Sequence, residues 1–460
     1  MSVLFANVLS LSILLLFISH RYFRTRSWIE PGAIFAINLL VLYPIRGLVL
    51  FLSQGAAATD YLEVYNQENL ESTSWLAALG CFSFVVGYLI VIGRGKLPIL
   101  NGRARRTQPE DVLVCTILFG ASLVGIAYKF ATKDYISYLI SDTRILALTQ
   151  LGNLLNLLQW PTYVGVWVLW FRKLRSPRFI ALFVSVQCVI VPLQFIQGSK
   201  TYLSLLLLSV LFAYYWSRGK VPKITALASA AIIVLFVFPY VSSFRDLVNT
   251  RYQTIPDLSS LDLQEIRQLV LNTADAESNE SQTLQHRLYD VSFRYSGIDQ
   301  LYKLTTMVPV VMPYRFGAGY IASLTALVPR VLWPEKPIYS RGAVYGAALG
   351  TITSITPFPV GEAYWDFGVT GVFISMIVWG ACLAGLVRGY ALLYNKPRLS
   401  FFGGIYFLSQ IYWIAGGETS MPETVSLLPQ QLAVLFVLYL LLRALTRRGE
   451  IGMLAEPCRT

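Results

Sequence analysis

The stretch SVLFANVLSLSILLLFIS, residues 2–19, decides the fold class, because it carries no charge and is long enough to cross a bilayer as a helix. Similar apolar runs recur along the chain, and we expect about eleven of them to span a membrane. They lie near residues 2–19, 32–53, 75–93, 111–128, 151–171, 179–197, 202–216, 224–243, 369–391, 400–416 and 425–445.

The composition predicts the same class. Hydrophobic residues make up 55% of the 460 and charged residues only 13%, whereas soluble domains carry about 25% charged residues. One aqueous core cannot bury this much apolar surface, so membrane lipid must cover the excess. The formal charge of +12 then indicates cytoplasmic anchoring of helices and attraction to an anionic substrate, and not binding to nucleic acid. We therefore predict an all-α polytopic integral membrane protein.

The sequence shows no pattern typical of a metal or cofactor site. Its 5 cysteines are scattered, no CxxC pair is present, and there are 2 histidines. A disulfide framework or a zinc site is therefore not expected. The chain also lacks a P-loop, so we expect no cofactor and no direct use of ATP.

Charged connections between the apolar runs set the expected orientation. Every second junction is basic, and the positive-inside rule places these junctions in the cytoplasm. They read HRYFRTR, GRGKLPILNGRARR, RKLRSPR, SRGKVPK, NKPRLS and RALTRR. This orientation leaves the N-terminus outside the cytoplasm and the C-terminus inside it.

Residues 244–368 form one long connection that this orientation places entirely outside. Loops of such length usually carry function. We divide the chain into an N-terminal transmembrane bundle of about eight spans (1–243), this outer segment with amphipathic or re-entrant helices (244–368), and a C-terminal bundle of about three spans (369–460). The outer segment is rich in arginine, although the positive-inside rule disfavours arginine there.

Two stretches of the outer segment have a readable pattern. In TLQHRLYDVSFRYSGIDQLYKL, residues 283–304, apolar residues recur every three or four positions and predict an amphipathic helix, with Asp299 on a polar face. One interpretation is a solvated helix with internal ion pairs, and the alternative is a helix whose polar residues face the substrate. The apolar residues 305–337 are interrupted by prolines and glycines, so we expect one or two short helices that lie along or dip into the outer leaflet, with Arg315 and Arg330 at their ends.

The stretch GEAYWDFG, residues 361–368, combines two carboxylates with aromatic residues just before a predicted span. Aromatic faces stack on sugar rings and carboxylates accept hydroxyl protons, so the pattern favours a sugar site. The alternative is an interfacial aromatic belt with incidental acids. Arg46, which lies inside a predicted span, is a functional candidate by default, because a charge there is costly unless it is paired.

Several motifs together resemble the Wzy-type polysaccharide repeat-unit polymerases of bacterial envelopes. They are the GSK turn at 198–200, VPRVLWPEKP at 328–337 and TPFPVGEAYWDFGVTG at 356–371. The resemblance implies a GT-C-like architecture in the inner membrane and a metal-independent glycosyltransferase that polymerises repeat units at the periplasmic face. The substrate would be an oligosaccharide on undecaprenyl diphosphate, the product O-antigen for lipopolysaccharide or an exopolysaccharide. A chain-length regulator and a flippase of the same pathway are the implied partners.

The implied reaction needs cations for the departing diphosphate and a base for the acceptor hydroxyl. The expected bases are, in order, Glu362, Asp366 and His286. The expected substrate-binding residues are Lys200, Arg245, Arg294, Arg315, Arg330, Arg341, Tyr364 and Trp365. Three alternatives stay open at this point: an O-antigen ligase that uses lipid A core as acceptor, an exporter without chemistry, and a structural scaffold.

Overall fold

The computed structural model describes the chain in segments. These are residues 2–25, 30–53, 66–93, 109–131, 154–196, 200–220, 223–237, 240–241, 297–326, 341–349, 355–394 and 400–415, together with single residues at 152, 328, 333, 433, 436, 437 and 440. Every regular element in these segments is helical, which confirms the predicted all-α class.

Fourteen of these elements are α-helices. They are α1 (Ser2–Thr25), α2 (Pro31–Leu40), α3 (Arg46–Ser53), α4 (Gln67–Ile92), α5 (Pro109–Ala131), α7 (Gln159–Phe171), α8 (Pro177–Ile196), α9 (Lys200–Arg218), α10 (Lys223–Ile232), α14 (Gly297–Met307), α15 (Ala318–Ala326), α16 (Arg341–Ala348), α17 (Phe358–Tyr394) and α18 (Ser400–Ala415). Two π-helical turns continue α2 and α10, namely η1 (Val41–Ile45) and η3 (Ile233–Val237).

Six helices within the described part of the chain are long and apolar enough to cross a membrane. They are Ser2–Thr25, Pro31–Phe51, Gln67–Ile92, Asp111–Ala131, Pro177–Ile196 and Phe358–Gly389. The protein is therefore a multi-pass membrane protein. The total of about eleven spans stays a prediction, and the run expected at 425–445 lies almost wholly outside the described residues.

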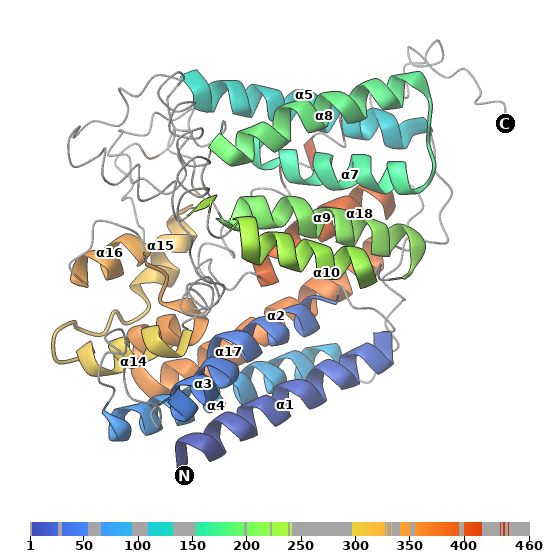
Figure 1. The fold of residues 1–460 in the computed structure, drawn as a ribbon. Helices are drawn as coiled ribbons and strands as arrows, with labels where there is room; N and C mark the ends of the chain where they lie inside the picture. The colour runs from blue at the N-terminus through green and yellow to red at the C-terminus, as the bar shows by residue number, and fades with distance from the viewer. Residues whose placement is uncertain are drawn as a thin grey trace, which may run out of the picture.

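The helices form two packed groups that run side by side (Figure 1). One group contains α1 to α4 with α17, and the other contains α5 and α7 to α10 with α18. The short helices α14, α15 and α16 lie together at one end of the molecule (Figure 1). The sequence predicted short helices in this outer segment, and the structure places α16 in its glycine-rich part.

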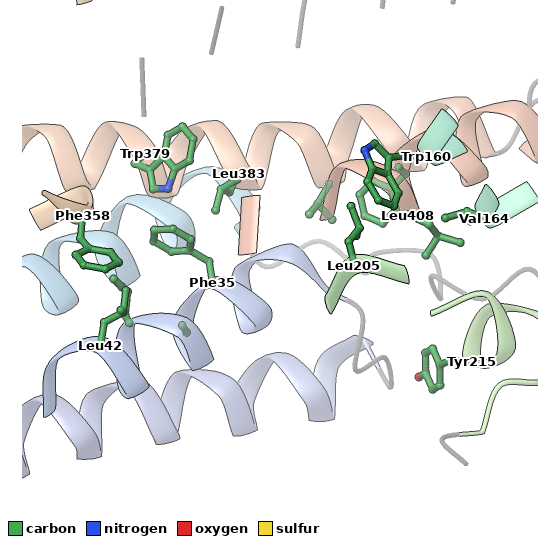
Figure 2. Packing of buried hydrophobic residues seen from close by; sticks show 14 of the residues in the cluster. Phe35, Leu42, Trp160, Val164, Leu205, Tyr215, Phe358, Trp379, Leu383 and Leu408 are labelled. Carbon is green, nitrogen blue, oxygen red and sulfur yellow. The ribbon is translucent and has the colours of Figure 1, made fainter. Parts of the chain in front are cut away.

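The packing of α4 against α17 is close enough to bring their backbones together. A Cβ atom on Gly87 would overlap the backbone carbonyl of Ile377, and one on Gly380 would overlap that of Phe84. Small residues allow such an approach between membrane helices, where dispersion contacts drive association. Figure 2 shows the adjoining core, in which Phe35 from α2 points toward Trp379 from α17, with ring centroids 6.0 Å apart.

A buried ion pair joins the C-terminal part of α1 to the residue that precedes α2. The Arg21 guanidinium lies 3.2 Å from the Glu30 carboxylate, and the Glu30 side chain also accepts a hydrogen bond from the Ala33 N–H at 2.8 Å. Burial raises the pKa of Glu30, and the Arg21 charge and these hydrogen bonds oppose that shift. The same guanidinium lies 5.2 Å from the centroid of the Tyr88 ring, so Arg21 also contacts α4.

Candidate functional site

The site begins at a kink in the long helix α17. Phe367 (φ −144°, ψ 21°) and Gly368 (φ 65°, ψ −148°) are not helical, so residues 358–366 form a separate helical arm before the span continues. Glycine takes a positive φ at little cost, which accounts for the break at Gly368. The sequence predicted a span from 369 onward, and the structure adds the arm that carries the GEAYWDF residues.

A short loop, residues 314–317, is hydrogen-bonded to the carbonyl groups that the kink leaves available. The Arg315 N–H donates to the Trp365 carbonyl oxygen at 3.1 Å, and the Phe316 N–H donates to that of Asp366 at 3.0 Å. Backbone carbonyls at a helix break need such partners when water is excluded. The loop therefore has a fixed position relative to the arm.

The Arg315 side chain lies over the ring of Trp365. Its guanidinium carbon is 4.6 Å from the ring centroid, which is the geometry of a cation–π interaction. The Trp365 ring is 3% exposed, whereas Arg315 is half-buried. Trp365 also contacts Tyr345 of α16, with centroids 5.9 Å apart. Trp365 thus supports the arginine. The neighbouring half-buried aromatic rings are those of Tyr314 and Tyr364, whose centroids are 6.3 Å apart.

Two carboxylates lie on the same arm, one helical turn apart. Glu362 is 1% exposed and Asp366 is fully buried. Positions i and i+4 share a helix face, so both groups lie on one side of the arm. Buried carboxylates are rare in membrane helices and typically mark functional sites. The arrangement therefore combines two acid–base groups with one held guanidinium.

The structure brings together five of the predicted site residues. They are Arg315, Glu362, Tyr364, Trp365 and Asp366, all within the loop 314–317 and the α17 arm. Lys200 is the first residue of α9, and Arg341 is the first residue of α16. Arg245, His286, Arg294 and Arg330 lie outside the described residues. The convergence of these six remaining residues on the site stays a prediction.

Sequence reasoning misplaced one residue and missed two others. Asp299, expected on a solvated face of its helix, is buried and forms an ion pair with Arg46. Tyr314 and Tyr345 are the missed residues, and their signal is weak, because isolated tyrosines in proline-rich or glycine-rich stretches are common. Among the described residues no group of three His, Cys, Asp or Glu side chains is placed to hold a metal ion.

Fold and site together define a multi-pass helical membrane protein with an arginine, an aromatic cluster and two carboxylates at the kinked end of a span. The chain belongs to the family described as "Domain of unknown function (DUF8712)", whose sequence model matches residues 121–404. It is also similar over 418 residues to two curated proteins named O-antigen polymerase, from Salmonella typhimurium (strain LT2) and Salmonella typhi.

Each of these relatives is 23% identical to this chain, and the similarity covers 88% of this chain and 86% of the relative. The expected resemblance to Wzy-type polymerases is thereby confirmed. No solved structure gives a significant match to the chain.

Proposed function

We propose that this protein polymerises lipid-linked oligosaccharide repeat units into O-antigen, as a glycosyltransferase of the bacterial inner membrane. Two relatives named O-antigen polymerase, similar over most of their length, support this class. The observation that carries the site is Arg315, held over Trp365 on the arm that also carries the buried Glu362 and Asp366. The names of the two relatives favour a polymerase over the ligase, exporter and scaffold alternatives.

In the proposed reaction Arg315 binds the diphosphate of the donor. The donor is a glycan on undecaprenyl diphosphate, presented at the periplasmic face. When the glycosidic bond to phosphate breaks, negative charge grows on the leaving oxygen, and a preorganised cation stabilises that charge. A guanidinium matches phosphate oxygens with paired N–H donors. The Trp365 ring and the backbone hydrogen bonds of the loop 314–317 supply the preorganisation.

The second half of the reaction is the attack of the acceptor. The terminal sugar hydroxyl of another repeat unit forms a bond to the anomeric carbon, the bonding pair of the departing oxygen leaves with the diphosphate, and the hydroxyl proton passes to a carboxylate. We assign this base role first to Glu362, then to Asp366, with His286 as the third candidate. Converging cations would take the part that a metal plays in other enzymes, so the reaction is proposed to be metal-independent.

The test of this function replaces Arg315 in a strain that lacks its own copy of the protein. Arg315→Ala should abolish long O-antigen chains and leave single attached repeats, and Arg315→Lys should give shortened chains because lysine keeps the charge but not the paired donors. The measurement is the glycan ladder on gels, read against the amount of protein in the membrane.

Arg175→Ala is the matched control, because Arg175 also lies over a tryptophan, 3.7 Å from the centroid of Trp170, but in a predicted cytoplasmic junction. It should leave the ladder intact. A normal ladder from a well-expressed Arg315→Ala protein would remove Arg315 from the site. Loss of every attached repeat on deletion of the protein would indicate a ligase, and an unchanged ladder would indicate neither activity.

A further inference from the structure

We infer that Arg46 and Asp299 are positioning residues for this site, because their ion pair sets the rotation of α14, and α14 holds the aromatic support of Arg315. The test of this inference by glycan length rests on the proposed function. Its test by cross-linking between α4 and α14 does not depend on that function.

The pair joins segments that are 253 positions apart in the sequence. The Arg46 Nε atom lies 3.1 Å from Asp299 Oδ2, and Arg46 Nη2 lies 3.4 Å from Asp299 Oδ1, a two-point contact. Their side chains are 7% and 2% exposed. Burying two charges gives little net stability, and the best-attested use of a buried polar pair is to fix one register among several.

Gln300, the residue after Asp299, connects α14 to α16, so the rotation of α14 affects the position of α16. The Tyr345 hydroxyl donates to the Gln300 side-chain oxygen at 3.0 Å and lies 3.3 Å from the Gln300 backbone carbonyl oxygen. Tyr345 is fully buried and packs on Trp365, which in turn lies under Arg315. Each step from Arg46 to Arg315 is therefore a direct contact.

A second contact links the rotation of α14 to the position of the carboxylates. Leu304 shares a helix face with Gln300, and a Cβ atom on Gly361 would lie 2.9 Å from Leu304 Cδ1. Gly361 directly precedes Glu362. Successive residues of a helix are separated by about 100°, so with Asp299 turned to α3, Gln300 and Leu304 face α16 and α17. A rotation of α14 would displace both halves of the site together.

The variant Asp299→Asn removes the charge with little change of shape. Arg46→Gln combined with Asp299→Asn is the second variant, because it leaves no unpaired buried charge and so protects the fold. Both should shorten the glycan ladder severalfold at an unchanged protein level. In an Arg315→Lys background neither should shorten it further, because residues that act through Arg315 are not additive with it. If Arg46 and Asp299 only stabilised the fold, their variants would shorten the glycans further in the Arg315→Lys background.

The structural readout is a disulfide between α4 and α14. Thr73 and Thr305 have hydroxyl oxygens 3.1 Å apart, so cysteines at both positions should cross-link on oxidation, as detected by peptide mass spectrometry. Asp299→Asn should reduce this cross-link severalfold. Unchanged cross-linking together with an unchanged ladder would overturn the inference. Reduced cross-linking with a ladder that no variant alters, Arg315→Ala included, would support the inference and refute the proposed function.

Discussion

At the scale of the residue, the site depends on the different surroundings of one guanidinium and two carboxylates. Arg315 has an aromatic ring beneath it, and a cation–π contact is worth about 0.5–2 kcal/mol depending on desolvation. Glu362 and Asp366 are instead buried on the arm of α17. The sequence showed the residue types at 361–368, but not that Trp365 faces an arginine from another segment, which leaves Tyr364 and Tyr314 as the more accessible rings.

The assignment of the base predicts a difference between two isosteric variants. Glu362→Gln should slow glycosyl transfer by roughly 10²-fold or more, as is typical when a general base is removed, and should leave donor binding unchanged. Asp366→Asn should have the smaller effect of the two. The measurement is single-turnover transfer, by the purified protein in detergent, from a lipid-linked donor to a lipid-linked acceptor, with donor binding measured separately. If Glu362→Gln transfers at the wild-type rate, another group is the base.

At the scale of the element, the kink in α17 decides where the loop 314–317 lies. Gly368 has a φ of +65°, and a Cβ atom there would lie 3.3 Å from the Tyr314 hydroxyl oxygen. The sequence indicated a break near this glycine, since it placed the start of a span at 369. It missed the helical arm, because prolines and glycines before residue 358 are typical of a loop and the pairing with residues 315 and 316 comes from far away.

Gly368→Ala should therefore disturb the site without unfolding the bundle. Gly368 has φ 65° and ψ −148°, a conformation that essentially only glycine adopts, so a residue with a Cβ atom is strained there by about 1–3 kcal/mol, and the added methyl group would press on Tyr314. We expect a shorter glycan ladder and a small loss of thermal stability. Tyr314→Phe should partly restore Gly368→Ala by removing the crowded hydroxyl group.

Gly385→Ala is the control on the same helix, because nothing lies within 4 Å of a Cβ atom there. It should match the wild type in ladder and stability. Equal ladders for Gly368→Ala and Gly385→Ala would show that the kink does not matter to function.

At the scale of the whole molecule, the beginnings of α1, α4 and α14 lie at the same end. The Trp75 indole N–H donates to the Ser2 hydroxyl oxygen at 2.9 Å, and the Asn66 N–H donates to the Tyr302 hydroxyl oxygen at 3.0 Å. We therefore expect the N-terminus and the candidate site to face the same side of the membrane. The basic junctions predict that this side is the periplasm.

Reporter fusions test that placement. Alkaline phosphatase, which is active only outside the cytoplasm, should be active when fused within the loop 314–317 and inactive when fused in the basic junction at 172–178. A fluorescent protein that folds only in the cytoplasm should give the opposite pattern. An active phosphatase at 172–178 with an inactive one at 314–317 would reverse the orientation and exclude a periplasmic reaction.

The sequence by itself determined the class of this protein. Long uncharged runs such as residues 2–19 can be satisfied only by helices in lipid, because an unpaired backbone group in hydrocarbon costs several kcal/mol. That requirement is local, so each apolar run predicts a membrane helix independently of the rest of the chain. The arginine-rich outer segment and the residues of GEAYWDFG were visible in the same local way, and they indicated an anionic substrate and a sugar site.

Only the tertiary structure decided which of these residues act together. The Arg46–Asp299 pair and the contacts that link Tyr345, Trp365 and Arg315 join segments whose spacing along the chain carries no periodic signal. Apolar helix faces are nearly interchangeable as packing surfaces in lipid, so hydrophobicity does not specify their neighbours. The neighbours follow from particular shapes and buried polar contacts, such as the close approach at Gly87 and Gly380, and these exist only in the folded bundle.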